Sequence, residues 1–334
     1  MLKKFLILIL LLLMIISCTK DRNKVNLSGI KVNLDIKRFE QKLFEADPSM
    51  IDSVIPDLEQ EFGNFFQIFN YRIIRIGSDE QPSYPDLLVK FVTDFDIYKI
   101  YVKTQEVFPN LNDLKSNLND AFRHYKYYFP EKDIPQIVTY VSGFNQAVVS
   151  DVNLLAIGLD DYLGVDEELY KQLGVYEYMI RNMHKERIPT DCMRLWASTE
   201  FPFNDSINNL ISNMIYEGMV MYFVDRMLPD QSATLTWGFT EDELTFCKNN
   251  EQQMWTYLIE NKLLFNSDKF TINKFIKEGP FTKDFSSESP ARAAVWIGYN
   301  IVKSYMKNHK NISLKQLMNE KIYQKILNAS FYNP

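Results

Sequence analysis

The sequence predicts an α+β protein that is mainly α-helical, with one small antiparallel β-meander packed on a helical body. Apolar residues follow helical spacing up to about residue 134 and again after residue 167. Between these parts, from about 135 to 160, the period changes to short β-type runs. With 46% hydrophobic residues and no linker after the N-terminus, residues 28–334 are expected to form a single globular domain.

The N-terminus has the pattern of a lipoprotein leader. Lys3 and Lys4 precede an apolar run at 5–16, which ends in Ser17-Cys18. This ending resembles the bacterial lipobox, in which cleavage before an obligatory Cys is followed by its acylation. We therefore predict a signal peptide at 1–17, lipid attachment at Cys18, and a lipidated tether at 18–27 that holds the protein on a bilayer.

Charge and cysteine content exclude some function classes. Removal of the leader takes away Lys3 and Lys4 and changes the formal net charge from −6 to −8. An acidic chain without a Lys/Arg stripe is a poor nucleic-acid binder, and no nucleic-acid partner is expected. Cys192 and Cys247 are the thiols that remain, and they either pair in an oxidising compartment or stay free and buried.

The N-terminal part begins with a strand-like pattern. Four apolar residues alternate with polar ones, which predicts a half-buried strand: Ile30, Val32, Leu34 and Ile36. Helical spacing follows at 48–66, 85–102 and 111–128.

The middle part predicts the meander. Runs at 137–141, 146–149 and 154–159 are separated by turn residues. The adjacent Asp160 and Asp161 offer oxygen ligands of the kind that calcium prefers, but they lack the alternating ligands of a calcium loop, so no calcium site is predicted.

The C-terminal half predicts several helices, and one of them carries an unusual carboxylate. Glu217 lies in the apolar stretch 214–224, where Ser206 is a plausible N-cap upstream. A buried carboxylate needs a partner or a raised pKa, and Gly218 beside it indicates close packing. Ser289-Pro290 is expected to start a later aromatic helix.

Motifs for catalysis are missing. The three histidines are His124, His184 and His309, and none has the HExxH spacing of a zinc site. The chain also lacks GxSxG, a P-loop and GxGxxG, so no catalytic residue, metal or cofactor is assigned. Nucleophilic catalysis by Ser or Cys needs no local motif and stays open.

Several segments in fixed order resemble the gliding-motility-associated lipoproteins of the GldB type found in Bacteroidota. The segments are FRHYKYYFPEKDIP (122–135), IGLDDYLG (157–164), MIYEGMVMYFVDRMLP (214–229), GPFTKDF (279–285) and SPARAAVWIGYNIVKSYM (289–306). The resemblance implies an acylated outer-membrane lipoprotein, more often on the periplasmic face than on the cell surface. Its implied partners are the bilayer, through Cys18, and unidentified envelope or gliding-machinery proteins.

A more distant resemblance concerns the site. The order of meander, helix and EG-containing helix is similar to gluzincin-like zinc peptidases, which places Glu217 at the third metal ligand. In that register Asp191 and Leu195 stand at the two ligand histidines, and Cys192 stands at the catalytic Glu. The resemblance implies a degenerate, zincin-like fold in which two of three ligands and the base are changed.

The resulting hypothesis is a non-enzymatic envelope lipoprotein with an accessory or scaffolding role. One alternative is a zinc-peptidase-like hydrolase with an atypical site around Glu217. Another is a module that binds a peptide or glycan in the degenerate cleft.

Overall fold

The computed structural model describes residues 25–334. The predicted signal peptide at 1–17, Cys18 and most of the tether at 18–27 lie outside the described residues. The described chain is mainly helical with one four-stranded sheet, which confirms the predicted balance of the two.

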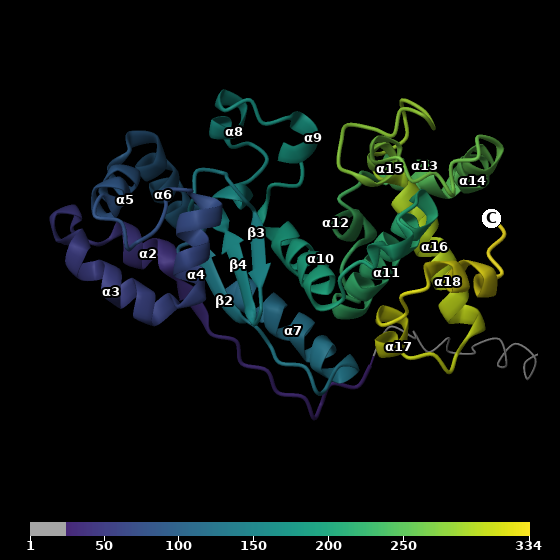
Figure 1. Cartoon of the computed structure of the whole chain (residues 1–334), viewed down its shortest axis with the longest axis horizontal. Helices are drawn as coiled ribbons and strands as arrows, with labels where there is room; N and C mark the ends of the chain where they lie inside the picture. The colour runs from purple at the N-terminus through teal and green to yellow at the C-terminus, as the bar shows by residue number, and fades with distance from the viewer. Residues whose placement is uncertain (1–24) are drawn as a thin grey trace, which may run out of the picture.

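Along the chain, helices lie between β1 (Ile36–Arg38) and β2 (Gln136–Tyr140) and again after β4 (Leu154–Gly158) (Figure 1). Those before β2 are α2 (Phe39–Phe44), α3 (Ile51–Phe62), α4 (Asn64–Ile68), α5 (Tyr84–Thr93), α6 (Phe95–Val107) and α7 (Asn112–Tyr128). Those after β4 are α8 (Glu168–Gln172), α9 (Glu177–Ile180), α10 (Ile188–Glu200), α11 (Leu210–Met227), α12 (Ala233–Trp237), α13 (Glu241–Asn249), α14 (Glu251–Glu260), α15 (Lys269–Ile276), α16 (Ala293–Asn308), α17 (Leu314–Met318) and α18 (Tyr323–Ser330).

The sheet is mixed, so the prediction of an antiparallel meander was wrong in its pairing. Its strands are β1 (Ile36–Arg38), β2 (Gln136–Tyr140), β3 (Val148–Asp151) and β4 (Leu154–Gly158), in the spatial order β1-β2-β4-β3. β3 and β4 form the expected antiparallel hairpin, but β4 pairs parallel with β2, and β2 pairs parallel with β1. β3 is therefore an edge strand.

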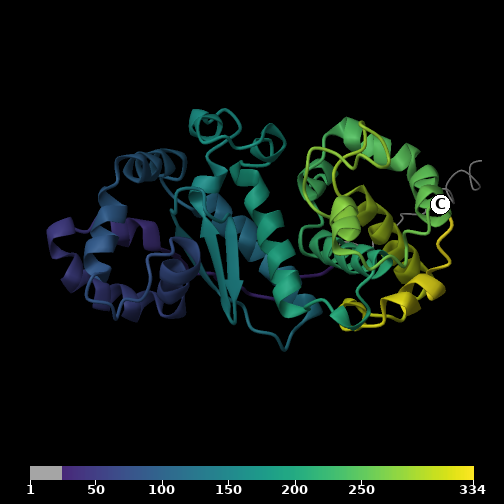
Figure 2. The ribbon, with the colours of Figure 1, turned by 45° about the horizontal axis from the view of Figure 1, so that its top comes forward.

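Burial on both faces explains the parallel pairing. Ile137, Leu155 and Ile157 pack into one hydrophobic core with α7, α10 and α11. Val138 and Ala156, which alternate with them, pack into a second core with α2 to α6. Figures 1 and 2 show the sheet between these two groups of helices. Parallel strands occur almost always where both faces are covered.

The segment before β1 is extended and alternates in burial as predicted, but only its end joins the sheet. Leu34 is buried whereas its neighbours Asn33 and Asp35 are exposed. Arg123 of α7 donates to the carbonyls of Leu27 and Ile30, each at 3.1 Å. The chain is thus fixed along α7 from Leu27 onward.

The two long C-terminal helices cross at paired glycines, which confirms the close packing predicted at Gly218. A Cβ on Gly218 would lie 2.3 Å from the carbonyl carbon of Gly298 in α16, and one on Gly298 would lie 1.8 Å from the carbonyl oxygen of Met214. α11 is buried almost all round, and its N-cap is Asn209 instead of the predicted Ser206.

α16 begins three residues later than Ser289-Pro290 predicted. Arg292 precedes it in the left-handed region, with φ of 60°. A non-glycine residue held there indicates that its surroundings impose the conformation.

Two further findings bear on function. Cys192 and Cys247 are free and buried, so the unpaired reading of the two thiols is the correct one. Within residues 25–334, no helix combines the length and the apolar character that a bilayer crossing needs.

Candidate functional site

A cavity of about 280 Å³ lies where α10, α11 and the start of β3 meet. Residues at i, i+3, i+4 and i+7 of a helix share one face, and this spacing brings four residues of α10 to the cavity. The lining residues are Asp191, Arg194, Leu195 and Ser198 from α10, Glu217 and Val220 from α11, and Ala147 and Val148 at β3. Three of the four positions predicted from the sequence therefore meet here.

Cys192, the fourth predicted position, does not face the cavity. Its side chain is completely buried on the core side of α10. Burial raises the pKa of the Cys192 thiol well above its ordinary value, with Asp191 adding to the shift. A neutral buried thiol is neither a nucleophile nor a metal ligand.

Both oxygens of Asp191 accept a hydrogen bond from another side chain. Its Oδ1 accepts a hydrogen bond from Nε of Arg187 at 3.0 Å, and its Oδ2 accepts one from the Tyr162 hydroxyl at 3.1 Å. Arg187 is 3% exposed and also donates to the carbonyl of Thr236. Asp191 is thus held as one member of a hydrogen-bonded ion pair.

Two further arginines face the other carboxylates. Arg292 Nη1 lies 2.7 Å from Oε1 of Glu278, and Arg194 Nη1 lies 3.5 Å from the same oxygen. Glu217 is half-buried, and its negative charge acts on both guanidinium groups. Asp191 and Glu278 therefore each pair with a guanidinium group, whereas Glu217 is not fully buried and acts on Arg194 and Arg292 only through its charge.

The field of these arginines changes the acidity of Glu278. Desolvation raises its pKa, but the guanidinium groups of Arg292 and Arg194 outweigh that effect and lower the pKa to about 2. Burial, together with the charge of Arg194, lowers the pKa of Arg292 to about 10, so Arg292 stays charged at neutral pH. Nε of Arg292 has no partner among the described residues.

The acidic pair next to the cavity is buried. The Asp160 carboxylate accepts from the amides of Ser142 and Phe144, at 3.0 and 2.8 Å. Desolvation raises the pKa of Asp160. Desolvation and the nearby charge of Asp160 raise the pKa of Asp161 well above its ordinary value. Within residues 25–334, no group of three His, Cys, Asp or Glu side chains is placed to hold a metal ion.

The edge of β3 offers backbone groups beside this cavity. The Ala147 carbonyl accepts from the Gly158 amide at 2.8 Å, so Ala147 and Val149 direct their backbone groups toward β4. Val148, between them, therefore directs its N–H and C=O away from β4. Val148 is half-exposed and lines the cavity.

Sequence reasoning missed the arginines of the site. Arg194 had a local signal, because it falls on the same face of α10 as Asp191 and Leu195. Arg292 and Glu278 had none, since they reach the site through the long connection between α15 and α16. The free edge of β3 followed only from the order of the strands.

The chain was compared with known proteins in three ways. A search of curated proteins and a search of solved structures each found no match. A family model described as gliding motility protein GldB matches residues 20–334. The match covers every residue that the structure describes and confirms the resemblance seen in the sequence. The chain therefore belongs to the gliding motility protein GldB family.

Proposed function

We propose that this gliding motility lipoprotein is not an enzyme and that it holds an extended segment of another envelope protein along β3. The observation that carries the proposal is the positive charge of three arginines around the carboxylates of the cleft, beside the edge strand β3. Arg187 pairs with Asp191, Arg292 pairs with Glu278, and the Glu217 charge lies in the field of Arg194 and Arg292. A divalent cation brought to Glu217 would meet these positive charges and would find Asp191 already bonded.

An extended peptide suits the edge of β3 better than a glycan does. Val148 presents an N–H and a C=O in the geometry that a neighbouring strand uses. The cavity below can take one side chain, and Arg194 and Glu217 offer opposite charges at its wall. Main-chain hydrogen bonds then give affinity, and this pocket gives selectivity.

The gluzincin-like origin of the cleft belongs to the same proposal. It is supported by the meeting of Asp191, Leu195 and Glu217 in one cavity, as the proposed register requires. Leu195 cannot coordinate a metal, and both Asp191 oxygens accept hydrogen bonds from protein groups. The cleft then keeps the shape of a peptide site without the parts for hydrolysis.

Lipid attachment at Cys18 and an outer-membrane position on the periplasmic face complete the proposal. The family match supports the lipoprotein assignment. A protein anchored in this way acts on partners within reach of one membrane surface.

Metal analysis tests the non-catalytic part. Protein purified without chelator is expected to contain zinc far below one atom per chain and to show no peptidase activity that Glu217→Gln removes. Stoichiometric zinc, lost together with such an activity in Glu217→Gln, would make the protein an enzyme and end the proposal.

Peptide selection tests the binding part. A random peptide library is screened against a chain that begins at Thr19, and selected peptides are titrated against two variants. Val148→Pro removes the outward N–H but is tolerated at a sheet edge, so peptide affinity should fall at least about tenfold. Val148→Thr keeps the N–H and should bind like the original chain. Equal binding by both variants would contradict addition of a strand at β3.

A further inference from the structure

A second and larger cavity, of about 1180 Å³, lies between α7, α11, α16 and α17. It shares no lining residue with the cavity at Glu217. Five cationic side chains line it, although the chain as a whole is acidic. They are Arg226, Lys303, Lys307, Lys310 and Lys315.

Three of these lysines form one exposed face. Lys303 and Lys307 lie four residues apart on α16, and Lys310 follows just after the helix ends. None of the three makes an ion pair with another residue of the described chain. Like charges at this spacing destabilise a helix by about 0.2–0.5 kcal/mol per pair, so their gathering here favours an anionic ligand.

Two carboxylates outside the lining act on the cations of this cavity, since Glu131 pairs with Lys315 at 2.5 Å and the charge of Asp225 acts on Arg226 and Lys303. Glu251 is the one carboxylate side chain among its described lining residues. Its Oε2 accepts from Trp296 Nε1 and Asn300 Nδ2, at 3.1 and 2.9 Å, and its Oε1 accepts from the Tyr332 hydroxyl at 2.7 Å. Three hydrogen-bond donors of the protein therefore hold the Glu251 carboxylate.

Tyrosines make the rest of the wall amphipathic. Tyr127 and Tyr128 come from α7, and Tyr222 comes from α11. The Arg226 guanidinium lies over the Tyr222 ring, 4.5 Å from its centroid. Tyr, Lys and Arg side chains each combine an apolar part with a polar tip. Such side chains fit the headgroup region of a bilayer, where the apolar part contacts lipid and the polar tip contacts water.

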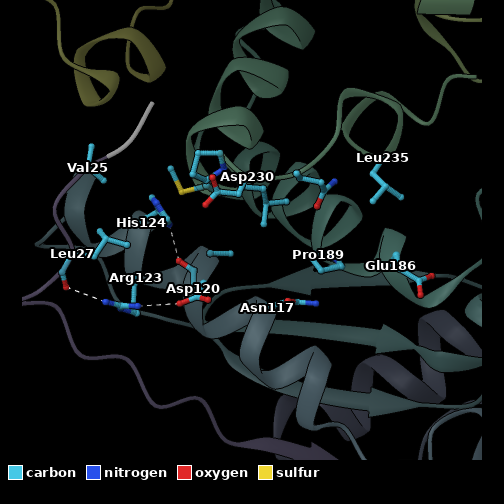
Figure 3. A pocket seen from close by; sticks show the side chains of 15 residues that line it. Val25, Leu27, Asn117, Asp120, Arg123, His124, Glu186, Pro189, Asp230 and Leu235 are labelled. Atoms are coloured by element: carbon cyan, nitrogen blue, oxygen red, sulfur yellow. Dashed lines mark hydrogen bonds and ion pairs between the residues drawn. The ribbon is translucent and has the colours of Figure 1, made fainter. Parts of the chain in front are cut away.

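The cavity lies next to the point where the described chain begins. Val25 lines a neighbouring cavity together with His124 of α7 and Asp230 after α11, and Figure 3 shows these three on one side of it. One turn along α7 from His124 is Tyr128, which lines the large cavity. The two cavities therefore share the ends of the same two helices.

The anchor limits how far this face can be from the membrane. Seven peptide units separate Val25 from Cys18, and a fully extended chain of that length spans at most about 25 Å. An acylated Cys18 thus keeps Val25, and the helix ends that its cavity shares with the large cavity, close to the bilayer surface. A soluble anion away from the membrane is not held near this face by the anchor.

We propose that the cavity of Lys303, Lys307 and Lys310 binds the phosphate of an anionic lipid headgroup in the membrane that carries the anchor. The inference rests on lipid attachment at Cys18, and it is independent of the cleft at Glu217. The lysines neutralise the phosphate, and the tyrosines contact the headgroup region. Together with the acyl anchor this contact turns one defined face of an acidic protein toward the lipid.

Vesicle binding tests the inference. The chain that begins at Thr19 keeps every described residue and has no acyl chain. Its binding is measured by flotation with neutral phosphatidylcholine vesicles and with vesicles in which about a third of the lipid is phosphatidylglycerol. It should prefer the anionic vesicles, and Lys303→Gln/Lys307→Gln/Lys310→Gln should weaken binding to them by about 100-fold.

Matched variants separate the site from net charge. Lys90→Gln/Lys99→Gln/Lys171→Gln removes the same charge from exposed positions on other helices and should bind like the original chain. Lys303→Arg/Lys307→Arg/Lys310→Arg keeps the three positive charges and should bind anionic vesicles like the original chain. Equal loss in the two Gln variants, no preference for anionic vesicles, or displacement by inorganic phosphate at matched ionic strength would overturn the inference. Lipid labelling at Cys18 is tested separately, because the chain used for vesicle binding begins at Thr19 and lacks that residue.

Discussion

Arg292 shows how a single residue can be decided by its surroundings. The sequence around it predicts a helix that starts at Ser289-Pro290, yet Arg292 adopts a left-handed conformation and the helix begins after it. The side chain is 2% exposed and faces Glu278. A buried guanidinium without a carboxylate is costly, and in this conformation Arg292 reaches Glu278.

Removal of the carboxylate at Glu278 should therefore destabilise the folded state. The pKa of Glu278 is lowered from its ordinary value near 4.5 to about 2, so its ion pair stabilises the folded state above pH 4.5. That contribution is lost as the pH falls from 4.5 toward 2. Glu278→Gln should lower the free energy of unfolding at neutral pH by about 1 kcal/mol, a modest value because the side chain is 59% exposed.

Urea unfolding across this pH range measures the effect. The difference between the original chain and Glu278→Gln should shrink as the pH falls toward 2. Glu288→Gln removes the same charge from an exposed position on the same connection and should leave stability nearly unchanged. A constant difference at all pH values would show that the ion pair is not responsible.

The crossing of α11 and α16 is the element on which the C-terminal body depends. Gly218 and Gly298 let the two backbones approach, and a Cβ at Gly298 would meet the backbone of Met214 at 1.8 Å. Backbone atoms cannot rotate aside as a flexible side chain can. The helices would have to separate, with loss of packing along their length.

Substitution at this crossing should therefore be severe. Gly298→Ala gains about 1 kcal/mol of helix propensity, but overpacking should still lower the free energy of unfolding by about 3 kcal/mol or more. Gly29→Ala places its Cβ in open space and should change stability by less than about 0.5 kcal/mol. Chemical denaturation measures both, and similar values for the two variants would contradict the crossing as described.

The sheet shows how far local pattern predicts an element. The β-type runs were found near their true positions, and the hairpin of β3 and β4 was expected. The insertion of β4 between β2 and β3 was not, because alternation along one strand does not identify its neighbour. The two hydrophobic cores, one on each face, settle that order.

For the whole molecule, lipid attachment should decide where the protein is found. Cys18→Ala should abolish incorporation of a labelled fatty acid and release or mislocalise the protein, as membrane fractionation would show. If the variant stays in the membrane fraction to the same extent, the acyl chain is not the sole anchor. Cys247→Ala changes a buried thiol and should leave labelling intact.

The sequence by itself was enough to predict the leader with its lipidation site, the helical character of the chain and its family. These depend on composition, local periodicity and the order of motifs. A distant resemblance to zinc peptidases also led to the prediction that Asp191, Leu195 and Glu217 lie together, and these three residues line one cavity. Only the tertiary structure decided the strand order, the inward position of Cys192 and the arginines that face the carboxylates. Those features depend on contacts between residues far apart in the chain, such as Glu278 with Arg194, and local spacing carries no record of such pairs.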